Sequence, residues 1–134
     1  MDAALGTTDA LEWSDSSRGG FYPLYTVWNN GLEVTATGGE DSISSLHISK
    51  LVGSFRTYVY TGNQGLSMEA WFDGLKRGRA TVSSGPLLEL EVGNALPGDT
   101  VQLPPNGGSV VISGRLRSIT ELDDVALYCN GKEV

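Results

Sequence analysis

The residues whose types could support chemistry gather in one stretch of the chain. Glu40 and Asp41 follow a pair of glycines, and His47 is the only histidine in the sequence. A carboxylate on a glycine-rich loop is a suitable ligand for a hard divalent cation, so Asp41 is the leading candidate for a metal ligand. The alternative role for Asp41 is that of a turn or cap residue. His47 is a second candidate ligand, but a solvated surface histidine is the more common case.

Three further residues are candidates for a functional role. Arg56 lies in the strand-like segment SFRTYVY, where a guanidinium can bind a phosphate or carboxylate in a bidentate manner or form an ion pair within the protein. Glu40 stands beside Asp41, and adjacent residues of an extended segment point to opposite faces, which argues against one shared site. Cys129 is the single cysteine, so the chain has no internal disulfide, and we expect a buried structural thiol.

These residues are too few for a complete active site. Catalytic zinc sites use at least three protein ligands, and this chain has one histidine. The sequence also contains neither a phosphate-binding loop motif nor a G-x-G-x-x-G between a strand and a helix. We therefore expect the chain to take part in catalysis only within a larger assembly.

The composition predicts an α+β, β-rich fold. Glycine occurs 18 times and proline 5 times among 134 residues, which implies many turns. The net charge of −7 argues against nucleic acid and anionic membranes as partners. No run approaches the ~20 apolar residues of a membrane span, and the start lacks the features of a signal peptide, so we expect a soluble chain.

The elements that must position these residues are read from local patterns. Ser67 is placed to cap a helix whose apolar stripe includes Trp71, expected to be buried, and Gly78 is placed to end it. Gly85-Pro86 breaks the chain before an all-β tail. The remaining predictions are helices over residues 3–11 and 21–29 and strands over 32–37, 54–60, 80–84, 87–92, 100–103, 109–117 and 125–129.

Several of these segments carry a family resemblance. The run GLKRGRATVSSGPLLELEVG, with Pro97-Gly98-Asp99 after it, resembles the end of the hydrolase domain in CehA/McbA-type metallohydrolases, relatives of the PHP (polymerase and histidinol phosphatase) phosphoesterases. The resemblance spans about residues 31–134. Three other segments match in the same order, namely Thr37-Gly38-Gly39-Glu40-Asp41-Ser42, Gly53-Ser54-Phe55-Arg56-Thr57-Tyr58-Val59 and Asn130-Gly131-Lys132.

The resemblance implies a division into two parts. Residues 1–85 would be the C-terminal portion of a PHP-like β/α barrel, left as incomplete αβ units, and residues 86–134 a small antiparallel, β-sandwich-like tail. Asp41 would match a metal ligand of the family, and Arg56 a family arginine. Ile43 stands where those enzymes often have a histidine, and the early H-x-H motif has no counterpart in this sequence.

The function implied belongs to a longer parent protein. That parent would hydrolyse a phosphoester, amide or carbamate of a small-molecule substrate with Zn, Mn or Fe, and we expect no metal on this chain alone. The alternative is a non-catalytic β-rich binding or interaction module. We also expect a homodimer, because barrel strands without their neighbours leave edges open and residues 132–134 offer a short return strand after Asn130-Gly131.

Overall fold

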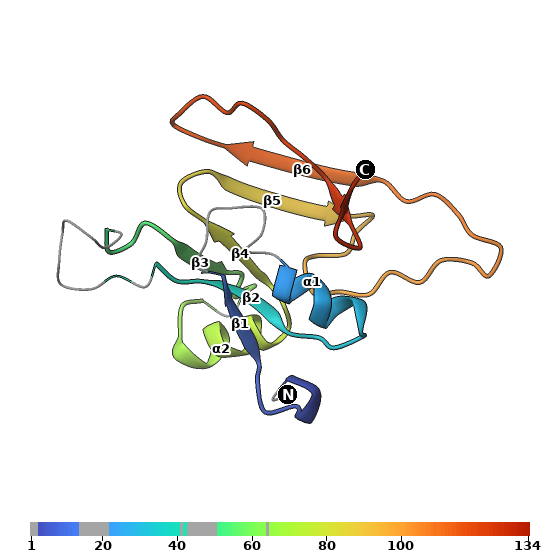
Figure 1. Ribbon diagram of the computed structural model, residues 1–134, viewed down its shortest axis with the longest axis horizontal. Helices are drawn as coiled ribbons and strands as arrows, with labels where there is room; N and C mark the ends of the chain where they lie inside the picture. The colour runs from blue at the N-terminus through green and yellow to red at the C-terminus, as the bar shows by residue number, and fades with distance from the viewer. Residues whose placement is uncertain (1–2, 14–21, 41, 43–50, 64) are drawn as a thin grey trace.

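The computed structural model describes residues 3–13, 22–40, 42, 51–63 and 65–134. It has an α+β, β-rich architecture of short helices and small sheets, and the described residues close no barrel (Figure 1). Its helical elements are η1 (Ala3–Leu5), α1 (Tyr22–Asn29) and α2 (Met68–Lys76). Its strands are β1 (Ala10–Trp13), β2 (Thr35–Gly38), β3 (Arg56–Val59), β4 (Ala80–Ser83), β5 (Leu87–Val92), β6 (Ile112–Arg117), β7 (Tyr128–Cys129) and β8 (Lys132–Glu133).

The first part of the chain contains a parallel βαβ unit. β1 pairs with β2 in parallel, from Ala10 opposite Thr35 to Trp13 opposite Gly38, and α1 lies between them in sequence. Parallel neighbours require a crossover connection, which is usually a helix. The predicted helix over residues 3–11 is therefore wrong, because its second half is drawn into a strand by pairing with β2.

A second sheet is built around α2. β3 and β4 pair antiparallel, and α2 connects them in sequence. The hydroxyl of Ser67 accepts a hydrogen bond from the Ala70 amide at 3.1 Å, which confirms the predicted cap. Gly74 is buried where a Cβ would lie 2.7 Å from the Tyr60 carbonyl oxygen, which explains a glycine inside this helix. Trp71 is only half-buried, so its predicted full burial is wrong.

Polar contacts connect the two sheets across a small core. The backbone amide of Gly38, at the end of β2, donates to the Thr57 hydroxyl of β3 at 2.8 Å. The Thr35 hydroxyl donates to the Leu75 carbonyl at 2.6 Å and so ties β2 to the end of α2. The buried apolar residues among those described are Leu24, Val34, Phe55 and Ala70.

The tail begins after the break at Gly85-Pro86, as predicted. β5 and β6 pair antiparallel, with Leu88 opposite Leu116 on one face and Glu89 opposite Arg115 on the other. After the turn at residues 97–100, the chain up to residue 111 forms an extended arm that projects from the body (orange in Figure 1). The predicted strand over 100–103 is wrong, because in the described chain that segment has no pairing partner.

A short hairpin completes the described chain. β7 pairs with β8 through Asn130 and Gly131, which take positive φ values of 52° and 77°. These values suit the two-residue turn that Asn-Gly favours. The hairpin lies on α1, where the ring of Tyr128 stacks on Tyr25 with centroids 6.4 Å apart. Every residue from 98 to 134 is nevertheless exposed.

Candidate functional site

The carboxyl ends of β1 and β2 form the edge where the sequence places its candidate ligands. In α/β folds the functional groups gather at this end of parallel strands. Two carboxylates are described there. Glu12 of β1 lies so close to Gly39 that a Cβ on that glycine would overlap the carboxylate, and Glu40 is the next residue. The glycine therefore lets the backbone after β2 pass beside a β1 side chain.

Glu40 connects this edge to the approach to β3. Its Oε1 accepts a hydrogen bond from the Gly53 amide at 2.9 Å and one from the Ser42 hydroxyl at 3.3 Å. These donors stabilise the charged form, and the Gly53 amide is the main reason that the pKa of Glu40 lies below its usual value. The ionised carboxylate of Glu40 thus holds the backbone at Gly53 by accepting the hydrogen bond from its amide.

Arg56 is the first residue of β3 and is exposed. Its backbone passes the end of β2, where a Cβ on Gly38 would lie 3.4 Å from the Arg56 carbonyl oxygen. Its Nε lies 4.0 Å from the Cβ position of Gly53, the residue that Glu40 holds. The guanidinium forms no ion pair with any described residue. The structure therefore brings Arg56 near the edge that carries Glu40.

Asp41 and His47, the predicted metal ligands, lie outside the described residues. The residues that are described contain no group of three or more histidine, cysteine, aspartate or glutamate side chains placed to hold a metal ion. The metal site at Asp41 therefore stays a prediction. Cys129 is exposed in β7, so its predicted burial is wrong. Among the described residues, the hairpin packs on α1 through Tyr128 and leaves Cys129 exposed.

Sequence reasoning missed Glu12 and an ion pair. Glu12 is missed because the predicted helix ends at Leu11 and no strand is predicted there, whereas the structure has a strand that ends beside β2. The ion pair joins Arg79 to Asp99 at 2.9 Å, across residues far apart in sequence. Its two partners belong to the segments GRATVSSGP and PGD. Both segments are part of the family resemblance, which was the one indication in the sequence that they are related.

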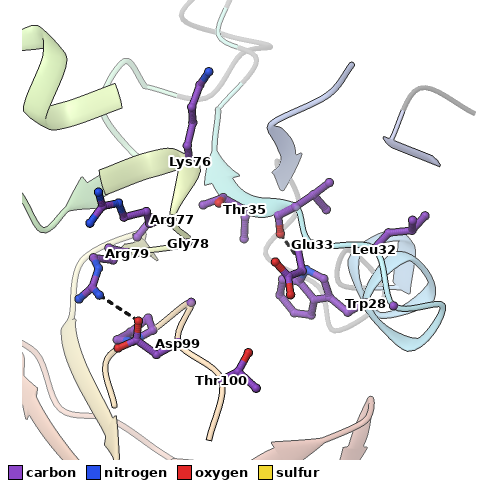
Figure 2. A pocket seen from close by; sticks show the side chains of 16 residues that line it. Trp28, Leu32, Glu33, Thr35, Lys76, Arg77, Gly78, Arg79, Asp99 and Thr100 are labelled. Atoms are coloured by element: carbon purple, nitrogen blue, oxygen red, sulfur yellow. Dashed lines mark hydrogen bonds and ion pairs between the residues drawn. The ribbon is translucent and has the colours of Figure 1, made fainter. Parts of the chain in front are cut away.

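A cleft lies at the opposite end of β2, away from the carboxyl edge. Its volume is about 900 Å³, and it opens between the approach to β2, the end of α2 and the turn at residues 97–100 (Figure 2). The residues that give it chemical character are Trp28, Glu33, Lys76, Arg79, Asp99 and Thr100.

The charged groups along this cleft are mostly paired. Lys76 lies 3.6 Å from Asp9, and Arg77 lies 3.2 Å from Asp73. Arg79 pairs with Asp99, as the dashed line at the lower left of Figure 2 marks. Glu33 is different, because its carboxylate has no hydrogen bond or ion pair with the described residues. Among the described residues of the cleft, Glu33 therefore offers an uncommitted carboxylate beside neutralised cations.

Comparisons with protein-family models, with curated proteins and with solved structures found no match. Neither helix in the described chain has the length and apolar character needed to cross a bilayer. The function of this chain must therefore be inferred from its geometry and from the resemblance of its segments.

Proposed function

We propose that this chain is the C-terminal portion of a PHP-like, metal-dependent hydrolase of the CehA/McbA type. The observation that carries the proposal is the parallel unit β1–α1–β2, because a strand, a helix and a parallel strand form the repeating unit of a β/α barrel. The resembling segment around Asp41 begins where β2 ends. That is the end of a barrel strand at which catalytic groups are found.

The carboxylate oxygens at this edge are ligand atoms of the kind that divalent cations bind. Glu12 and Glu40 supply oxygen at this edge, Asp41 follows Glu40 in the sequence, and Mn and Zn accept oxygen ligands. Two of the three are constrained by other contacts, since Glu12 lies against Gly39 and Glu40 holds Gly53. Asp41 is thus the residue proposed to bind the metal, with the other ligands supplied by the rest of the parent. A metal bound there would activate a water molecule for attack on the substrate.

The other residues of the edge would act by position. Glu40, ionised at neutral pH, fixes the backbone of Gly53 to the end of β2 through its 2.9 Å hydrogen bond. This contact holds the start of β3, and therefore Arg56, at the same edge. We assign to Arg56 the binding of an anionic substrate group, because a guanidinium matches a phosphate or carboxylate in a bidentate manner.

A non-catalytic interaction module is the second candidate. The observation that favours it is the tail, in which every residue from 98 to 134 is exposed. The β5–β6 sheet has an apolar face that includes Leu88, Leu90 and Leu116 and a charged face on which Arg115 lies 3.6 Å from Glu89. A two-stranded sheet with one apolar face is marginal in water until something covers that face.

The genomic sequence upstream of Met1 separates the two candidates. The hydrolase proposal requires an in-frame H-x-H motif there, because the chain itself supplies one histidine. A stop codon or an unrelated domain in that position would favour the interaction module instead. In either case we expect the isolated chain to show no turnover of p-nitrophenyl phosphate with Mn²⁺ above the background rate.

A further inference from the structure

Trp28 presents a fixed aromatic surface to the cleft shown in Figure 2. Its indole N–H donates to the Val34 carbonyl at 2.8 Å, which sets the orientation of the ring. Tyr25 contacts it edge-to-face with centroids 5.9 Å apart. The residue is nevertheless 41% exposed. An indole that is both held and exposed is prepared to receive a flat ligand at little entropic cost.

The polar groups of the cleft can both accept and donate hydrogen bonds. Glu33 supplies a carboxylate without a partner among the described residues, and Thr100 supplies a hydroxyl that is likewise free there. The Arg79 guanidinium uses one NH₂ group on Asp99 and has further N–H groups to offer. A ligand whose own groups both donate and accept would satisfy this wall.

The same geometry argues against other ligand classes. An anion is disfavoured because Lys76, Arg77 and Arg79 each have a carboxylate partner. A quaternary ammonium favours a cage of several aromatic faces. Here the ring of Tyr25 stacks on Tyr128, and among the described residues Trp28 is the one aromatic ring that lines the cleft. A neutral ligand with an apolar face and hydroxyl groups remains.

We propose that this cleft binds a neutral carbohydrate, with the C–H face of one sugar ring on the Trp28 indole and its hydroxyl groups donating to Glu33. Thr100 and the free N–H groups of Arg79 contact hydroxyl groups from the opposite wall. The cleft lies at the amino end of β2, and the proposed metal site lies at the carboxyl end. The proposed carbohydrate site is therefore independent of the proposed hydrolase function, and each can be tested without the other.

Saturation-transfer NMR on the full chain tests this site, with cellotriose, maltotriose, xylotriose and triacetylchitotriose as probes. We expect transfer to the ring C–H protons of at least one of them. Trp28→Phe and Glu33→Gln should each weaken its binding roughly tenfold, since each removes one main contact. Trp71→Phe is the matched control, because Trp71 lies on α2 and does not line the cleft.

Circular dichroism checks that each variant folds, because Trp28→Phe also removes the hydrogen bond to Val34. If that variant fails to fold, the decision rests on Glu33→Gln, whose side chain is exposed. The proposal is overturned if no trisaccharide receives transfer. It is equally overturned if Glu33→Gln binds as tightly as Trp71→Phe, or if adenosine binds where all four sugars fail.

Discussion

The guanidinium of Arg79 lies 2.9 Å from the carboxylate of Asp99 and joins the start of β4 to the turn that follows β5. The second carboxylate oxygen of Asp99 accepts the Leu96 amide at 3.0 Å, so the same side chain also closes its own turn. This contact brings the segments GRA and PGD together in space. They are the two halves of one joint between the helical part of the chain and its tail.

Two glycines let the backbones meet at this joint. Gly78 ends α2 with a φ of 74°, and Gly98 turns beside it with a φ of 86°. A Cβ on Gly98 would overlap the carbonyl oxygen of Arg77, and a Cβ on Gly78 would lie 2.9 Å from the Cα of Gly98. The joint therefore depends on the lack of a side chain at Gly78 and Gly98 as much as on the ion pair.

The ion pair should contribute measurably to stability. Its side chains are 23% and 38% exposed, so solvent screens it in part, and we expect a coupling free energy of about 1 kcal/mol. A double-mutant cycle with Arg79→Ala and Asp99→Ala, followed by urea unfolding, measures it. The pair Arg77 and Asp73 on the surface of α2 is the control, with about 0.3–0.5 kcal/mol expected. Equal couplings would show that the joint does not depend on this pair.

Gly98→Ala should destabilise the chain far more than a comparable glycine substitution. The control is Gly107→Ala, at a φ of 81° with no atom within 4 Å of the added Cβ. Both variants place alanine in the left-handed region, at about 1–2 kcal/mol each. Only Gly98→Ala adds the overlap with Arg77, which we expect to cost about 1–3 kcal/mol more. Equal midpoints in urea unfolding would mean that the joint is loose.

Glu40 should make the stability of the chain depend on pH in the acidic range. Its pKa in the folded chain lies below the ordinary value of 4.5, so its contribution is present above that pH and is lost as the pH falls through the folded value. Urea unfolding of the parent and of Glu40→Gln at several pH values measures this contribution. The two curves should differ at neutral pH and converge in acid. A difference that stays constant with pH would show that the ionisation of Glu40 does not contribute to stability.

The chain should associate with itself in solution, with a dimer as the expected species. Its β5–β6 face exposes apolar side chains such as Leu90, and burial of that face should outweigh the screened charge of −7. Sedimentation equilibrium measures the mass. Leu90→Lys should weaken the association, whereas Glu91→Gln on the opposite face adds the same charge and should not. A single 14.2 kDa species at every concentration would contradict this prediction.

Local rules predicted the parts of the fold that have local causes. Ser67 and Gly78 bracket α2 because a cap and a left-handed glycine act within one helical turn. Asn130-Gly131 predicted the last hairpin because that dipeptide suits the positive φ values of the turn. The break at Gly85-Pro86 and the strand β5 have equally local causes.

The errors of prediction arose where distant partners decide the structure. Residues 10–13 hold good helix formers, yet pairing with β2 makes them a strand, and this also hid Glu12. Residues 100–103 alternate as a strand should but find no partner in the described chain. For the site, the roles of Arg56 and Asp41 stay predictions. The hydrogen bond from Gly53 to Glu40 could not be predicted, because it depends on how two segments meet.

The most direct test of the central claim is metal-dependent turnover by the polypeptide that runs from the upstream H-x-H motif through Val134. Hydrolysis of bis-p-nitrophenyl phosphate with Mn²⁺ is measured for this protein and for its Asp41→Ala variant, with Asp123→Ala in the exposed tail as the control. We predict turnover in the parent and the control, and a loss of at least about 100-fold in Asp41→Ala, because a metal ligand is removed. Turnover that survives Asp41→Ala unchanged, or a parent with no turnover, would contradict the claim.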